Sequence, residues 1–152
     1  MAQTKILAVD DDRNLLELIH MRLEASGYYI VSADHENAAK EVASREIFDV
    51  AVIDLQLVTQ DGLSLMEELH LSHPDMPVII LTAHGSIESA VEAMQRGAFT
   101  YLTKPFDSRE LILQIERARE RVQLTGEINR LKELLEERFN FANIIAKSDR
   151  MR

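Results

Sequence analysis

The sequence contains no cysteine, which excludes disulfide bonds and thiolate metal sites and suits a reducing compartment. No apolar run approaches the roughly 18 residues that a membrane-spanning helix needs. The first residues lead directly into a short apolar run and lack the features of a signal peptide. Together these absences predict a cytoplasmic protein that makes no contact with a membrane.

Basic residues are outnumbered: 17 Lys and Arg stand against 26 Asp and Glu, for a formal charge of −9. Binding to a nucleic-acid backbone requires clustered Lys and Arg. We therefore expect no direct nucleic-acid contact from this segment. The acidic excess is typical of solvated faces together with a cluster of carboxylates.

Five short apolar runs alternate with segments of helical apolar spacing. The runs are typical of strands buried on both faces of a sheet, and they cover residues 5–9, 28–33, 50–54, 78–81 and 99–103. The segments between them predict helices over residues 12–25, 36–44, 63–71 and 87–96, and a last helix opens after Asp107. Five such units predict an α/β fold with a doubly wound parallel sheet and right-handed crossovers.

Polar side chains stand at the ends of four of these runs. Asp10 and Asp11 follow the first run, and Asp54 ends the third. Thr82 follows the fourth run and Lys104 follows the fifth. Open α/β sheets place their sites at the carboxyl edge of the strands. We therefore expect three carboxylates, a hydroxyl and an ammonium group to converge at one edge.

Such a cluster suits phosphoryl chemistry. Three neighbouring carboxylates repel one another, and a hard cation relieves this; Mg²⁺ prefers one or two carboxylates, water and a phosphate. A carboxylate can also attack a phosphoryl group to give an acyl phosphate, a transfer that depends on positioning and charge neutralisation. Mg²⁺ and Lys104 would neutralise phosphoryl oxygens, and the Thr82 hydroxyl would donate a hydrogen bond to one.

Residues 1 to about 120 resemble the receiver domain of two-component response regulators. Each matching motif is weak alone, but five in the same order and spacing are specific. The motifs are Val9-Asp10-Asp11, Ile53-Asp54, Asp61-Gly62, Leu81-Thr82-Ala83 and Thr103-Lys104-Pro105-Phe106. The resemblance implies a flavodoxin-like five-stranded sheet in the order 2-1-3-4-5, with helices on both faces and an extended C-terminal helix.

The resemblance also implies the roles of the acidic residues. Asp54 would accept a phosphoryl group from the histidine of a sensor kinase. Asp11 would bind Mg²⁺ directly and Asp10 through water, with Asp54 and the backbone carbonyl of Gln56 completing the protein ligands. Gln56 and His84 occupy positions that influence dephosphorylation in the family.

Further roles are implied for the residues around the phosphate. Lys104 and the backbone of Ala83 would bind it, while Thr82 and Tyr101 match the pair whose hydroxyl and ring move on activation. Pro105 would follow a cis peptide bond. In the family, a Met-Pro pair often follows the acceptor, and this chain has Leu57-Val58 instead.

Several alternatives stay open. The chain could be a receiver-like scaffold that dimerises without phosphorylation, or a Mg²⁺-dependent phosphohydrolase, although such enzymes would be expected to carry an acid where this chain has Gln56. A dinucleotide-binding domain would need a Gly-rich loop after the first strand, and none is present. Asp12 is more typical of a helix cap than of a metal ligand. His70 and His73 form a conceivable metal pair without an evident third ligand.

The C-terminal third has heptad patterning. Leu111, Ile115, Ala118 and Val122 fit one frame, and Leu124, Ile128, Leu131 and Leu135 fit another, offset by one residue near 123–126. This offset predicts a slip or a break in the helix. About two heptads each is marginal for an autonomous coiled coil. We interpret the segment as a dimerisation helix with contacts from Ile115, Val122, Ile128, Leu131 and Leu135; docking onto the receiver itself is the alternative.

Residues 139–148 resemble the opening of the AAA+ ATPase domain in sigma-54-dependent transcription activators of the nitrogen-regulator type. The expected organisation is a receiver domain over residues 1–120, a helical linker over 121–138 and the start of a truncated AAA+ domain over 139–152. Further AAA+ and DNA-binding domains would lie outside this chain. The expected function is a phosphorylation-dependent switch, not an enzyme that turns over a free substrate.

Overall fold

The computed structural model describes the backbone of residues 3–57, 61–83 and 85–150, and their side chains except those of residues 125 and 139–150. The chain forms two compact units, Met1–Arg119 and Glu120–Arg152. Among the described residues, no helix has both the length and the apolar character needed to cross a membrane.

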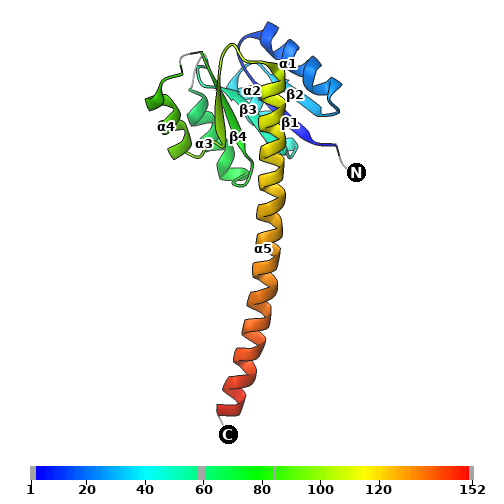
Figure 1. Ribbon diagram of the computed structural model, residues 1–152, viewed down its shortest axis with the longest axis vertical. Coiled ribbons are helices and arrows are strands. Elements are labelled where there is room, and N and C mark those ends of the chain that lie inside the picture. The colour runs from blue at the N-terminus through cyan, green and yellow to red at the C-terminus, as the bar shows by residue number, and fades with distance from the viewer. Residues whose placement is uncertain (1–2, 58–60, 84, 151–152) are drawn as a thin grey trace. The chain divides into compact units, whose positions relative to one another are not determined.

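The first unit contains a five-stranded parallel sheet in the order β2-β1-β3-β4-β5 (Figure 1). The strands are β1 (Lys5–Val9), β2 (Tyr29–Ala33), β3 (Val50–Asp54), β4 (Val78–Thr82) and β5 (Thr100–Thr103). Every residue of β3 and β4 is buried, as expected for strands covered on both faces. The predicted fold class and strand order are confirmed.

The strand bounds differ slightly from those predicted. β4 includes Thr82, because Thr82 continues the ladder opposite Thr103. β2 begins one residue later than expected because the Tyr28 amide instead donates to the Leu23 carbonyl at the end of the preceding helix. The polar residues at the strand ends therefore lie on, or next to, regular strand backbone, which fixes the direction of each side chain.

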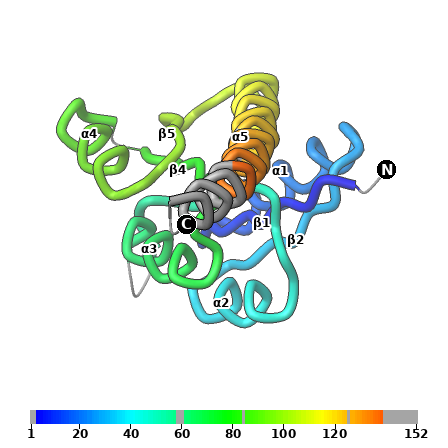
Figure 2. The backbone as a smooth tube through the Cα atoms, turned by 90° about the horizontal axis from the view of Figure 1, so that it is seen from below, coloured from blue at the N-terminus to red at the C-terminus, as the bar shows by residue number. Residues whose placement is uncertain are grey.

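Five helices surround the sheet: α1 (Arg13–Ala25), α2 (Glu36–Arg45), α3 (Gly62–Ser72), α4 (Ile87–Gln95) and α5 (Ser108–Arg150). Figure 2 shows α1 and the first turns of α5 on one side of the sheet and α2, α3 and α4 on the other. Two apolar clusters match this division. One joins the sheet to Leu16, Ile19 and Leu23 of α1, and the other joins it to Leu65, Met66 and Leu69 of α3.

Glycines close α1 and α4. Gly27 has φ 94° and Gly97 has φ 113°, a left-handed conformation that L side chains adopt at a steric cost. Each lies one residue past the helix cap, at Ser26 and Arg96 respectively. These glycines let the chain turn sharply towards the next strand.

The first turns of α5 belong to the core of the first unit. Leu111, Ile115 and Ala118 are buried in the apolar cluster that they share with α1 and one face of the sheet. The assignment of Ile115 to a dimer interface is therefore wrong: the side chain has no exposed surface left for a partner. For this part of the heptad stripe, docking onto the receiver itself is the correct alternative.

The rest of α5 belongs to the second unit. The helix continues without interruption through Gly126, so the change of heptad frame is not a break in the helix. In the second unit, the second heptad stripe is exposed: Leu124, Ile128, Leu131 and Leu135 have between 51% and 65% of their surface accessible.

We predict that Ile115→Ala destabilises the receiver by about 2–5 kcal/mol, since it leaves a cavity in a fully buried site. The control is Leu113→Ala on the same helix, where 46% of the side chain is exposed and the change should stay within about 0.5 kcal/mol. Urea unfolding followed by circular dichroism measures both. Equal effects for the two variants would contradict the packing of Ile115.

Candidate functional site

Three polar side chains from separate strands meet at the carboxyl edge of the sheet. Asp10 follows β1, Asp54 ends β3 and Lys104 follows β5. The Lys104 Nζ lies 2.8 Å from Asp10 Oδ2 and 3.5 Å from Asp54 Oδ1. Asp10 is 1% exposed and Asp54 is 5% exposed. One ammonium group is thus shared between two buried carboxylates.

The acidic cluster fits a hard divalent cation. Asp10, Asp11 and Asp54 each offer a carboxylate oxygen, and these oxygens all lie within 4.8 Å of one another. Asp11 is exposed while the other two are buried, so the group opens to solvent on one side. An all-oxygen donor set with room for water is what Mg²⁺ prefers. Receiver domains, as a class, bind Mg²⁺ in an acidic pocket of this kind.

The charge balance of the cluster is unfavourable for Asp54. Burial, followed by repulsion from Asp10, raises the pKa of Asp54 to about 6, and Lys104 offsets only part of this. At neutral pH the ionised carboxylate is therefore destabilised in the folded protein. A cation at the site would relieve the repulsion between the carboxylates, so this set of oxygen donors fits a divalent cation.

Lys104 is held in a charged state by the carboxylates. Burial works to lower its pKa, but the hydrogen bond that Lys104 donates to Asp10 and the charges of Asp10 and Asp54 raise it overall. The peptide bond between Lys104 and Pro105 is cis, the geometry that the resemblance implied. Sequence reasoning assigned Lys104 to a phosphate; its close hydrogen bond to Asp10 was not predicted.

The loop after β3 is held against the acceptor strand. The Gln56 amide donates to Asp54 Oδ1 at 3.4 Å, and the Gly62 amide donates to the Leu55 carbonyl at 2.6 Å. A Cβ on Gly62 would lie 2.1 Å from the Asp54 carbonyl oxygen. Only glycine permits this approach, which explains the Asp61-Gly62 motif physically. The role of the Gln56 carbonyl as a metal ligand stays a prediction.

The predicted switch residues lie on the neighbouring strands. Thr82 is buried at the end of β4, next to β3, and Ala83 follows it. Tyr101 on β5 is half-buried and packs against the apolar cluster on the α3 face. Their roles in phosphate binding and switching stay predictions. His84 and Val58 lie outside the described residues.

Three other polar residues have structural roles. Asp12 is the N-cap of α1 and accepts hydrogen bonds from the amides of Asn14 and Leu15. His70 Nε2 lies 2.8 Å from the Met76 carbonyl oxygen, and His73 Nε2 lies 2.9 Å from the Ala43 carbonyl oxygen. Each imidazole thus binds a different part of the backbone.

The N-cap of α3 was missed. Asp61 Oδ1 accepts the Ser64 amide at 2.7 Å. An acidic residue followed by glycine at the start of an apolar helix is a recognisable cap signal, so the cap could have been predicted. The contact between Gly62 and Asp54 depends on tertiary structure and could not.

Comparison with known proteins identifies relatives over most of the chain. The sequence profile described as response regulator receiver domain matches residues 6–116. The chain is 45% identical over 115 residues to the transcriptional regulatory protein GlrR of Escherichia coli K12, covering 76% of this chain and 26% of that protein. It is 37% identical over 132 residues to the nitrogen assimilation regulatory protein NtrX of Azorhizobium caulinodans, covering 85% and 29%.

Solved structures agree. The structure of NtrX from Brucella abortus in complex with ADP gives a TM-score of 0.81 at 33% identity, covering 86% of this chain and 30% of that one. A CheY-like receiver domain protein from Methanospirillum hungatei gives 0.78 at 30% identity, covering 82% and 100%. This chain therefore spans less than a third of GlrR and NtrX but the whole of an isolated receiver. The names include nitrogen regulators, the type to which the sequence resemblance pointed.

The raised pKa of Asp54 predicts how stability depends on pH. The pKa is about 6 in the folded state and 3.8 ordinarily. Between these values the folded state binds more protons than the unfolded chain, so this contribution to stability falls as pH rises through the window. Without divalent cations, Asp54→Asn should therefore be more stable than wild type above pH 6, by up to about 3 kcal/mol, and this difference should fade towards pH 4.

Urea unfolding in chelator between pH 4 and 8 measures this difference. Asp75→Asn, at an exposed position on the loop after α3, is the control for a surface carboxylate. Added Mg²⁺ should reduce the advantage of Asp54→Asn by stabilising the wild-type protein alone. An advantage that is the same at pH 4 and pH 8 would contradict the charge strain at Asp54.

Proposed function

Because this chain belongs to the family of response regulator receiver domains, we propose that it is a phosphorylation-dependent switch that accepts a phosphoryl group on Asp54. Response regulators receive their signal from histidine kinases, and we take a sensor histidine kinase as the donor. The observation that carries the proposal is the approach of Lys104 to both Asp10 and Asp54 at one sheet edge. This arrangement supplies an acceptor carboxylate, a cation ligand and a cationic partner for phosphoryl oxygens.

Asp10, Asp11, Asp54 and the Gln56 carbonyl are the groups that would hold Mg²⁺. When bound, the ion neutralises negative charge on the phosphoryl oxygens and on the approaching carboxylate. This matters because the site holds two buried carboxylates and only one close ammonium group. Without added positive charge, a dianionic donor would be repelled.

In the transfer step, a carboxylate oxygen of Asp54 forms a bond to phosphorus while the bond between phosphorus and the kinase imidazole nitrogen breaks. The imidazole retains the electron pair of that bond. The Lys104 ammonium group moves from Asp10 and Asp54 to a phosphoryl oxygen. The Ala83 amide and the Thr82 hydroxyl donate hydrogen bonds to the other phosphoryl oxygens. The protein needs to supply positioning and charge neutralisation only.

The phosphoryl group then acts as a bound ligand that shifts a conformational equilibrium by its differential affinity for two states. The contacts that would differ are those of Thr82 and Lys104, and Tyr101 on β5 would follow the hydroxyl. Gln56 and His84 flank the phosphoryl group and would influence its hydrolysis. The activities of the domain are limited to its own phosphorylation and dephosphorylation.

The heptad pattern of the second unit supports the proposal that the protein transmits its signal as a homodimer. With Leu124 at a d position, Ile128, Leu131 and Leu135 follow at a, d and a. A β-branched residue at a with Leu at d, as at Ile128 with Leu124 and Leu131, favours a parallel two-helix coiled coil. Glu127 then falls at g and Lys132 at the following e, where opposite charges attract across a parallel pair. Val122 lies outside this frame. We propose a parallel homodimer through the stripe from Leu124 to Leu135.

We further propose the organisation of a cytoplasmic sigma-54-dependent activator, in which residues 1–120 form the receiver and 121–138 the linker. Residues 139–152 would begin an AAA+ ATPase domain that continues, with a DNA-binding domain, outside this chain. The support is sequence similarity to transcriptional regulators of which this chain spans less than a third. The side chains of 139–150 lie outside the described residues.

We predict that acetyl phosphate and Mg²⁺ add one phosphoryl group to the wild-type protein and none to Asp54→Asn. Intact mass spectrometry measures the adduct. Lys104→Ala should still label but more slowly, because it removes the cation that faces the acceptor. Asp75→Asn is the control and should label like wild type.

The alternatives predict different results in the same experiment. A phosphohydrolase would release phosphate steadily without an accumulating adduct. A phosphorylation-independent scaffold would show neither adduct nor release. Labelling that survives in Asp54→Asn would place the acceptor on another residue.

For the dimer, we predict that Leu131→Lys gives a monomeric mass in light scattering, since it places a charge in the centre of the apolar stripe. Asn129→Lys adds the same charge one position outside the stripe and should leave the dimer intact. Both are measured with and without beryllofluoride and Mg²⁺. A mass for Leu131→Lys equal to that of a dimeric wild type, or a wild type that is monomeric in both conditions, would contradict the proposed interface.

A further inference from the structure

α4 has little apolar packing to hold it in place. Of its residues, only Ala93 is buried. Ile87, Val91 and Met94 are 83%, 48% and 48% exposed, respectively. By contrast, α3 buries Leu63, Leu65, Met66 and Leu69. The position of α4 must therefore depend largely on what holds its two ends.

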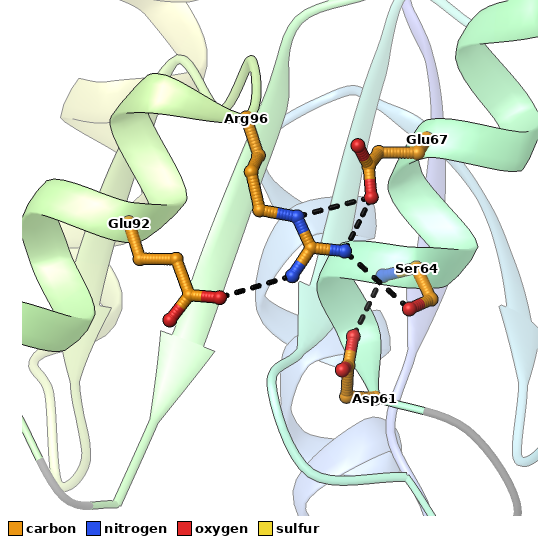
Figure 3. A network of polar contacts seen from close by, with 5 residues as sticks. All are labelled: Asp61, Ser64, Glu67, Glu92 and Arg96. Atoms are coloured by element: carbon orange, nitrogen blue, oxygen red, sulfur yellow. Dashed lines mark hydrogen bonds and ion pairs between the residues drawn. The ribbon is translucent and has the colours of Figure 1, made fainter.

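The C-terminal end of α4 is held by Arg96, its C-cap residue. The guanidinium group hydrogen-bonds to Glu67 Oε1 through Nε at 3.0 Å and, at closer range, through a terminal nitrogen. It also donates to Ser64 Oγ at 3.4 Å and to Glu92 Oε1 at 3.2 Å. Figure 3 shows the guanidinium group between the two helices, with Glu92 on α4 and both other partners on α3.

This arrangement differs from an ordinary surface ion pair. Isolated surface pairs contribute little, but networks with good geometry contribute more, and the planar guanidinium group suits several acceptors at once. The Arg96 side chain is 27% exposed, so most of it is shielded from water. The hydrogen bond to Glu67, outweighing burial, raises the pKa of Arg96 above its ordinary value.

The part of α3 that Arg96 contacts lies next to the acceptor strand. The Ser64 amide donates to Asp61, and Asp61 pairs with Gln56 through an isolated antiparallel bridge. Gly62 abuts the Asp54 carbonyl so closely that no Cβ fits. The first turn of α3 is thus fixed relative to the site, and it provides a firm anchor for Arg96.

The other end of α4 is reached from Thr82. Ser86, four positions after Thr82 in the sequence, is the N-cap of α4, and its hydroxyl accepts the Ser89 amide at 3.0 Å. α4 therefore lies between two attachments that both lead back to the same sheet edge. One runs through the loop after β4, and the other runs through Arg96 and α3.

We propose that Arg96 is a positioning residue: its contacts with Glu67 and Ser64 hold the C-terminal end of α4 to α3 and thereby couple the position of α4 to the site at Asp54. The coupling rests on the proposed function; the attachment of α4 does not. Any shift of α4 relative to α3 has to break or re-form these hydrogen bonds. Arg96 thus sets part of the energy difference between positions of α4.

Amide hydrogen exchange of the whole chain tests the attachment. In Arg96→Gln, exchange over residues 87–95 should become about fivefold faster, as for the loss of a networked ion pair, while exchange in α2 and β3 stays unchanged. The matched control is Arg45→Gln, which removes an ion pair to Glu41 within α2 and should leave α4 unchanged. Unchanged exchange in α4, or an equal increase in every element, would overturn the proposal.

A double-mutant cycle separates the pair from its members. If Arg96 acts through Glu67, Glu67→Gln should also speed exchange in α4, and the double variant should exchange no faster than Arg96→Gln alone. Additive effects would mean that the two residues act separately, contrary to the proposal.

The coupling is tested by the affinity for beryllofluoride with Mg²⁺. By reciprocity, a contact whose energy differs between positions of α4 changes this affinity, and we expect a change of about threefold or more in Arg96→Gln. Tighter binding of beryllofluoride by Arg96→Gln would mean that the Arg96 contacts stabilise the anion-free state. Weaker binding would mean that they stabilise the anion-bound state. Equal affinities would overturn the coupling, whereas a wild type that does not bind beryllofluoride would overturn the proposed function and leave the exchange result standing.

Discussion

The site depends on one ammonium group shared between two buried carboxylates. Lys104 is within hydrogen-bonding distance of Asp10 and 3.5 Å from Asp54. Burial and, after it, repulsion from Asp10 raise the pKa of Asp54 to about 6, because the one positive charge of Lys104 offsets only part of these effects. The folded protein therefore carries a standing excess of negative charge at the edge of its sheet. A bound cation would relieve this excess.

The parallel sheet creates this arrangement. β1, β3, β4 and β5 follow one another in the sheet and run parallel, so that Asp10 and Lys104, more than 90 positions apart in sequence, meet at one edge. Helices cover both sides of the sheet, because its central strands are buried on both faces. The loop after β3 then folds back tightly, with Gly62 against the Asp54 carbonyl. The backbone at Asp54 is therefore held by its strand neighbours and by this loop.

Sequence patterns predicted the strands and the polar residues at their ends, because strand burial leaves a local signal, and the family resemblance supplied the strand order. They did not predict that Ile115 is fully buried in the receiver core, since a heptad stripe looks the same whether it packs on a sheet or on another helix. They also missed the contacts of Arg96 with Glu67 and Ser64, which join helices separated by a strand. The hydrogen bond from Lys104 to Asp10 was missed for a different reason: sequence reasoning considered the site only with its phosphate. Pairings of this kind depend on side-chain geometry and leave no periodic signal.

The free energy of exposing buried side chains decides whether a phosphoryl group could displace α3 or α4. Reversing a two-state equilibrium from 1:99 to 99:1 requires about 5.5 kcal/mol of differential affinity. Displacing α3 would uncover four large buried side chains, at a cost of roughly 6–12 kcal/mol. This cost is larger than that differential affinity. Displacing α4 would uncover Ala93 alone, at less than about 1 kcal/mol, together with the hydrogen bonds of Arg96. If Asp54 is the acceptor, as proposed, its phosphorylation would therefore shift α4 more readily than α3, and the contacts at Arg96 would be the main interactions to break.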